Sequence, residues 1–199
     1  MSKRIFVDLG ANKGKAIIKA LKIYPYMDLY IAYEPIPRHH KRLKRVYCKP
    51  EYKIYPYAVD ICKELDSKES DDFDKVYVKY FWIDKGRYSL GSSFYGDKKS
   101  GHLKMKTTNV VDFSHIFSHF TSEDYVILKM DIEGKEYDLL DYVIKSDKLS
   151  AIKKIYVEWH WNKIQSITKE RHDNLVKKLQ DLGFEITGDS VEDQFCHGV

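Results

Sequence analysis

The feature that most constrains the fold of this chain is the stretch Ile5–Gly14 near its N-terminus. Its first half is a short apolar run of strand length, and Gly10 and Gly14 bracket the turn that follows. Glycine adopts positive φ and lets a ligand approach the backbone closely. Apolar residues then recur at helical spacing over 16–23. We therefore expect a buried strand, a glycine turn and a helix whose N-terminus presents free N–H groups to a ligand.

A carboxylate follows this turn at a distance typical of nucleotide-binding folds. Glu34 ends the apolar run Leu29–Tyr33, about 20 residues after the turn, where such folds place a ribose-binding acid. Its two oxygens can accept hydrogen bonds from a ribose 2′,3′-diol. The turn reads Asp-x-Gly-x-Asn-x-Gly, unlike the Gly-x-Gly-x-x-Gly of dinucleotide-binding proteins. An ordinary crossover in an unrelated α/β protein would have a similar turn but no reason to place Glu34 there.

Composition limits the protein to a few classes. The 199 residues are 43% hydrophobic, which fits a single globular domain over 1–199. A net charge of +4 permits an anionic partner without requiring one. Cys48, Cys62 and Cys196 have no paired spacing, so we expect neither a zinc site nor a disulfide framework, and a reducing, cytoplasmic location. We expect no signal peptide, because a strand begins almost at the N-terminus, and no membrane span.

Strand-like and helix-like segments alternate along the chain. We expect strands at 5–9, 29–34, 52–60, 75–83 (an extra strand, possibly antiparallel), 103–111, 125–131, 151–158 and 184–187, with helices between them and a solvated loop at 64–74. This alternation predicts an α/β fold with a mostly parallel central sheet and helices on both faces. Ligands of such sheets lie across the carboxyl ends of the strands.

Two further segments stand out by composition. Residues 38–45 form a strongly basic helix, which is either a solvated helix face or a contact for phosphate or another acidic group. Residues about 86–101 are rich in glycine and serine, and are either a lid over a binding site or a merely mobile loop.

Several acidic residues coincide with predicted strand exits. They are Asp8, Glu34, Asp60, Asp131 and Glu158, the last with His160 two residues later. Surface carboxylates scattered at random have no reason to coincide with strand exits. Because the carboxyl ends of parallel strands meet at one edge, we expect these groups to converge on a single crevice.

Four segments resemble the FkbM-type family of S-adenosylmethionine-dependent methyltransferases, which implies the Rossmann-like class I methyltransferase fold. They are Val7–Gly14, Tyr33–Pro35, Leu128–Glu136 and Val157–His160, in the order and at the separations of the family. Weaker matches occur at Tyr57–Asp60 and Ser92–Phe94. The resemblance spans about residues 4–160, and Lys-x-Asp-x-Glu-Gly-x-Glu at 129–136 is its most specific part.

The resemblance implies methyl transfer from S-adenosylmethionine to a hydroxyl oxygen of a small molecule, sugar or lipid. It implies that the first turn holds the methionine part of the cofactor, through Asp8, Gly10, Ala11, Asn12 and Gly14. Glu34 would bind the ribose, and Ala58 and Asp60 would lie beside the adenine. Asp131 and Glu133 would face the sulfonium and the acceptor, with Ser92, Ser93 and Glu158 on the acceptor side. The chain lacks the helices that many members carry before the first strand, and it has one strand where the usual sheet ends in a hairpin.

Transfer to a hydroxyl requires a base for its proton. His160 is the first candidate, because an ordinary histidine pKa near 6.5 suits the task; the alternative is a structural histidine. Asp131 or Glu133 could orient it, or could bind Mg²⁺ that acidifies the hydroxyl. Asp131 could also cap the following helix, which does not exclude cofactor contact.

Three other functions fit part of the pattern. An RNA 2′-O-methyltransferase would use a Lys-Asp-Lys-Glu set, for which Lys129, Asp131 and Glu158 are present but a second lysine is not evident. A non-catalytic S-adenosylmethionine-binding module would keep the pocket without turnover. A different nucleotide cofactor, such as a nicotinamide, would also suit Glu34.

Overall fold

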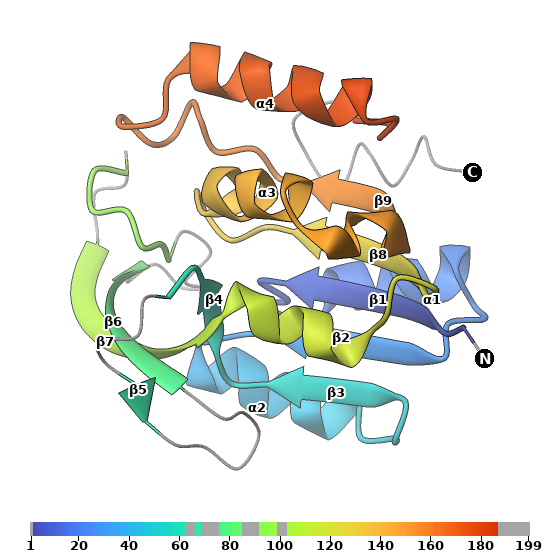
Figure 1. Ribbon diagram of the computed structural model, residues 1–199. Helices are drawn as coiled ribbons and strands as arrows, with labels where there is room; N and C mark the ends of the chain where they lie inside the picture. Colours follow the sequence, from blue (N-terminus) through green and yellow to red (C-terminus); the bar gives the residue numbers. More distant parts are fainter. Residues whose placement is uncertain (1, 63–66, 69–75, 85–91, 99–102, 187–199) are drawn as a thin grey trace.

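The central sheet consists of five parallel strands in the order β3-β2-β1-β8-β9 (Figure 1). The computed structural model describes residues 2–62, 67–68, 76–84, 92–98 and 103–186. The five strands are β1 (Arg4–Leu9), β2 (Leu29–Tyr33), β3 (Tyr52–Tyr55), β8 (Tyr125–Met130) and β9 (Ile152–Val157). The strand order reverses direction between β1 and β8, and the crevice at such a point is where open α/β sheets bind ligands.

Helices cover both faces of this sheet, as the alternation predicts (Figure 1). One face carries α1 (Lys15–Ile23) and α2 (Pro37–Val46), and the other carries the 3₁₀ helix η2 (Phe113–His119) and α3 (Glu136–Ile144). Helix α4 (Lys169–Asp181) packs against α3, and a short 3₁₀ helix, η3 (Asp147–Ala151), precedes β9. Alternation along β1 divides the core, with Phe6 facing α1 and α2 while Ile5 and Val7 face α3. The predicted Rossmann-like α/β fold is confirmed.

A second, smaller sheet lies beside the carboxyl edge of the first (Figure 1). Its order is β4-β7-β6-β5, formed by β4 (Ala58–Asp60), β5 (Ser67–Lys68), β6 (Val76–Asp84) and β7 (Leu103–Asp112). Strand β6 is antiparallel to β7, which confirms the antiparallel direction considered for 75–83. The paired β6 and β7 curve beside the ends of the central strands, and Phe81 of β6 lines the crevice there.

Two strand predictions need correction. The stretch 52–60, expected to be a third strand and its exit, contains the strand β3 and then β4 in the other sheet, separated at Pro56, which has no N–H to continue a ladder. The strand expected over 184–187 does not form over 184–186. There Phe184 N donates back to Leu179 O at the end of α4, and Phe184 and Ile186 pack on the core. Residue 187 lies outside the described residues.

The two predicted loops are described only in part. Of the loop predicted at 64–74, residues 67–68 pair with β6 as β5, and the rest lies outside the described residues. Of the glycine- and serine-rich stretch 86–101, only 92–98 is described. This part pairs with β6 through Ser93 and with Ile164 through Lys98. Over the described residues, no helix has the length and apolar character needed to span a membrane.

Candidate active site

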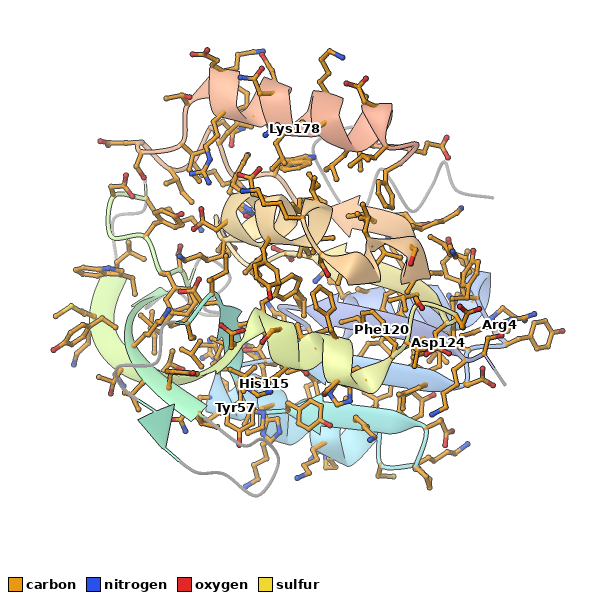
Figure 2. All side chains as sticks on the ribbon, in the orientation of Figure 1. Arg4, Tyr57, His115, Phe120, Asp124 and Lys178 are labelled. Atoms are coloured by element: carbon orange, nitrogen blue, oxygen red, sulfur yellow. The ribbon has the colours of Figure 1, made fainter. Side chains whose placement is uncertain are left out.

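A pocket of about 580 Å³, including the part open to solvent, lies at the carboxyl edge of the central sheet. We call it the strand-end pocket. Seven residues predicted from the sequence line it: Gly10, Asn12, Glu34, Ala58, Ser92, Asp131 and Glu133. In Figure 2, Tyr57, which also lines it, lies on the side toward which the central strands point, while Arg4 and Asp124 lie on the opposite side.

The turn after β1 is held tightly against the neighbouring strands. The amides of Gly10 and Ala11 both donate to Tyr33 O at 3.1 Å. Gly10 has φ +78°, and a Cβ placed on it would lie 1.9 Å from Asp131 O. The turn therefore needs glycine here both for its dihedral angle and for its approach to the end of β8.

Glu34 closes the same turn from β2. Its carboxylate accepts hydrogen bonds from Asn12 N at 2.7 Å and from Ile36 N at 2.8 Å. Burial raises the pKa of Glu34 to about 7, although these two hydrogen bonds oppose the shift. Because each oxygen retains a further lone pair, the carboxylate can still accept from a ligand diol.

Beneath the turn, Asp8 and Lys129 form a buried ion pair. They are direct neighbours across β1 and β8, and Lys129 Nζ lies 2.8 Å from Asp8 Oδ1. Neither Asp8 oxygen accepts a well-aligned hydrogen bond among the described residues, so charge holds this contact. Lys129 Nζ also donates to Gly10 O at 2.9 Å. Burial opposes its charge, but Asp8 and Asp131 outweigh this and raise the pKa of Lys129. The pair thus ties the turn to β8.

The segment after β8 is organised by a carboxylate that sequence reasoning missed. Glu136, fully buried, accepts from Ile132 N at 2.9 Å and from Gly134 N at 2.8 Å. Glu133 between them has φ +58°, which costs a non-glycine residue roughly 1–2 kcal/mol. Backbone strain of this kind clusters at functional sites. The glutamate three residues after Glu133 in the specific segment was the available sequence signal.

His160 joins β9 to this segment. Its Nε2 lies 3.0 Å from Glu133 Oε2 and its Nδ1 lies 3.1 Å from Glu136 Oε1. Burial alone would lower the pKa of His160, but Glu136 and then Glu133 outweigh it and raise the pKa to about 10. At neutral pH the imidazole is therefore protonated, with both nitrogens donating to carboxylates. The role of base predicted for His160 would require it first to lose this proton.

Lys98 reaches the same carboxylate from the described segment 92–98. Its Nζ is ion-paired with Glu133 Oε2, and its side chain is only 6% exposed. Ser93 Oγ donates to Glu133 O at 2.5 Å, which fixes the same segment. Together His160 and Lys98 outweigh burial and lower the pKa of Glu133. Nothing in the local sequence around Lys98 indicates this contact, because it joins residues 35 positions apart.

Asp131 lines the pocket, and its side chain is the most exposed of the carboxylates in this cluster. Its side chain is 35% exposed, and its Oδ1 lies 3.9 Å from His160 Nε2. Burial raises the pKa of Asp131 to about 6, while Lys129 opposes the shift. Asp131 N donates to Leu9 O at 3.0 Å, which places the residue beside the glycine turn.

The remaining predicted residues lie outside the pocket lining. Ala11 and Gly14 are buried in the turn, and Ser93 is fully buried under Glu133. Asp60 forms ion pairs with Lys79 and Lys135, and Glu158 lies 3.7 Å from Lys163. His39, Phe81 and Phe94 line the pocket and were not predicted. They come from α2, β6 and segment 92–98, whose positions depend on the tertiary fold.

One side-chain group could hold a metal ion. Ligand atoms of Asp131, Glu133 and His160 all lie within 4.8 Å of one another. However, the Lys98 ammonium and the protonated imidazole already place positive charge beside Glu133. Mg²⁺ binding by Asp131 and Glu133 is one of the two roles that the sequence left open for these carboxylates, and the chelation experiment below tests it.

The fold and the placement of these groups at one sheet edge are those of a Rossmann-like methyltransferase. The family model described as Methyltransferase FkbM domain matches residues 8–186, most of the chain. The chain belongs to this family and is a methyltransferase. Comparison with curated proteins and with solved structures gave no match.

Proposed function

We propose that this protein transfers the methyl group of S-adenosylmethionine to a hydroxyl oxygen of a small molecule, sugar or lipid. The observation that carries the proposal is the convergence of Gly10, Glu34 and Asp131 on one pocket from the exits of β1, β2 and β8. A cofactor with an adenosyl group and a cationic sulfonium matches such an arrangement of a glycine turn and two carboxylates.

The pocket residues fit this cofactor chemically. Glu34 offers two carboxylate oxygens to a ribose diol, and Gly10 leaves room for a ligand at the turn. Asn12 lines the pocket, and its Oδ1 is buried without a hydrogen-bond partner among the described residues. An ammonium group of the methionine part would satisfy this oxygen. When bound, the cofactor supplies an electrophilic methyl group on sulfur.

We assign proton removal from the acceptor hydroxyl to Asp131. Its carboxylate is partly exposed in the pocket. Both nitrogens of His160 donate to carboxylates, and Glu133 is paired closely with Lys98 and His160. The ion pairs of Asp131 are longer, at 3.7 Å to Lys129 and 3.9 Å to His160. The pKa of Asp131 is raised to about 6. This pKa is closer to neutral pH, and a general base works best when its pKa lies near the working pH. In this proposal His160 and Glu136 hold Glu133 and the end of β8 in position.

The RNA 2′-O-methyltransferase alternative gains no specific support. Its catalytic lysines would have to face the acceptor ribose, but Lys129 Nζ contacts Asp8 and Gly10 O beneath the turn. For the second lysine, the structure offers Lys98, which pairs with Glu133, and Lys163, which lies 3.7 Å from Glu158. RNA therefore enters the experiment below as one acceptor among others.

Calorimetry and a methyl-release assay together test the proposal. We expect the purified protein to bind S-adenosylmethionine and S-adenosylhomocysteine but not NAD⁺. Incubation with pools of hydroxyl-bearing glycans, lipids and small molecules should then release S-adenosylhomocysteine. Binding without turnover on any pool would favour a non-catalytic module, turnover only on RNA would favour the alternative enzyme, and binding of NAD⁺ alone would overturn the cofactor assignment.

Replacing Asp131 with asparagine is expected to lower kcat by roughly 10²–10⁴-fold, the usual contribution of a general base. The wild-type rate should also fall as the pH drops below about 6, because the base must be deprotonated. Steady-state kinetics over pH 5–8 and calorimetry of cofactor binding check both results. Asp181→Asn is the matched control, because Asp181 lies on α4, where it pairs with Lys177, and outside the pocket lining. An equal loss of kcat in both variants would contradict the assignment.

Removal of divalent cations is expected to leave the rate unchanged. Lys98 and His160 supply the positive charge that a metal would otherwise place beside Glu133. The measurement is the initial rate after dialysis against excess chelator. A loss of rate that Mg²⁺ restores would instead establish the metal site predicted from the sequence.

A further inference from the structure

The face of the sheet covered by α1 and α2 has an unusual charge. The two helices contain eight lysines and arginines and no acidic residue: Lys15, Lys19, Lys22, Arg38, Lys41, Arg42, Lys44 and Arg45. The net charge of the whole chain is +4, so the rest of the chain carries a net charge of −4. The surplus of positive over negative charge is therefore found on this pair of helices.

The two helices lie on the same face of the sheet and meet where α1 begins and α2 ends. A Cβ on Gly14 at the start of α1 would lie 2.8 Å from Leu43 Cδ2 and 2.9 Å from Tyr47 Cε2. Figure 1 shows both helices on the same side of the sheet, opposite α3. We call the outer side of α1 and α2 the basic face.

The basic face also exposes aliphatic side chains. Ile18 on α1 is 49% exposed and Val46 on α2 is 57% exposed. Ile18 lies one helical turn beyond Gly14, and Val46 lies one turn beyond Leu43, so both are close to the line where the helices meet. Cations that surround exposed aliphatic residues on a helix are typical of proteins that bind at the membrane–water interface.

The opposite side of the molecule has a different charge pattern. On α4, Lys169 pairs with Asp173 and Lys177 pairs with Asp181. Lys178 of α4, labelled in Figure 2, lies 3.6 Å from Asp141 of α3. Helix α4 thus carries both basic and acidic residues, whereas α1 and α2 contain basic residues and no acidic ones.

We propose that the basic face docks on an anionic lipid bilayer surface. Clusters of four to eight lysines and arginines on an amphipathic helical surface bind anionic lipid headgroups, and Ile18 and Val46 would enter the boundary between headgroups and acyl chains. A nucleic acid would satisfy the cations equally but would leave the two aliphatic side chains without a role.

Because Ile36 and His39 at the start of α2 line the strand-end pocket, docking places that pocket near the bilayer. The proposal does not depend on methyl transfer.

Vesicle sedimentation of the whole protein without cofactor tests the docking. We expect binding to vesicles of phosphatidylcholine with 30% phosphatidylglycerol, no binding to phosphatidylcholine alone, and release at high salt. The triple variant Lys41→Gln, Arg42→Gln and Arg45→Gln should bind about 100-fold more weakly. The control neutralises three cations of α4, with Lys169→Gln, Lys177→Gln and Lys178→Gln, and should bind like the wild type.

The aliphatic side chains separate a bilayer from a nucleic acid. Ile18→Ser with Val46→Ser keeps every charge, and we expect it to weaken vesicle binding while circular dichroism shows an intact fold. Absence of vesicle binding at low salt, or an equal loss in the α4 control, would overturn the proposal. So would tight binding of a polyuridine oligomer that the serine variant retains, because the face would then serve RNA.

Discussion

Replacing Gly10 with alanine is expected to abolish cofactor binding, with a loss of affinity of at least about 100-fold. The added Cβ would lie 1.9 Å from Asp131 O, and φ at this position is +78°. The dihedral angle alone costs an alanine about 1–2 kcal/mol. Relief of the clash must in addition separate the exits of β1 and β8, and these two exits shape the strand-end pocket. Calorimetry with S-adenosylhomocysteine measures the loss.

Gly183 provides a matched control for this substitution. It has φ +88°, but a Cβ placed there meets no atom within 4 Å. Gly183→Ala should therefore carry the same dihedral cost of about 1–2 kcal/mol while leaving ligand affinity unchanged. If the two alanine variants bound the ligand equally, close approach of the turn to β8 would not be what shapes the pocket.

Replacing Lys129 with methionine is expected to destabilise the protein by about 3–5 kcal/mol, because it leaves the Asp8 carboxylate buried without its partner. Asp8 is fully buried and Lys129 Nζ is the charge that faces it at 2.8 Å. This is a large part of the 5–15 kcal/mol by which domains are stable. Urea unfolding of the wild type and the variant measures the difference.

Two further variants show whether the charge of Asp8 causes the loss. Adding Asp8→Asn to Lys129→Met removes the uncompensated charge, so the double variant should be less destabilised than the sum of the single changes. Lys79→Met removes an ion pair with Asp60 that is partly exposed and that Lys135 also supports. We expect this control to cost about 1 kcal/mol or less. A Lys129→Met variant as stable as the control would contradict a structural role for the buried pair.

Much of the pocket could be predicted from local sequence. Gly10, Glu34 and Asp131 each end a strongly apolar run, and a parallel sheet brings the ends of its strands to one edge. The family resemblance, and not strand-end reasoning, implied Ala58 and Ser92, and both line the pocket. Asp60 also ends a strand, but in the second sheet, where it faces Lys79 and Lys135 instead.

The roles within the cluster could not be predicted in the same way. His160 has an ordinary histidine pKa only when it is considered alone. The carboxylates of Glu136 and Glu133, on either side of Gly134 in the sequence, raise this pKa to about 10. Lys98 meets Glu133 only because segment 92–98 crosses the exit of β8. The proton acceptor suggested by the sequence therefore differs from the one that the geometry favours.

By itself, the sequence determined the order of strands and helices and the polar residues that end the strands, because hydrophobic periodicity and turn chemistry act over a few neighbouring residues. Only the tertiary structure decided which of these polar groups contact each other. The pairing of β1 with β8 placed Asp8 opposite Lys129. The packing of segment 92–98 and of the end of β9 against the segment after β8 brought Lys98 and His160 into contact with Glu133. Charge state and burial depend on these long-range contacts, and so does the choice of the group that can accept a proton.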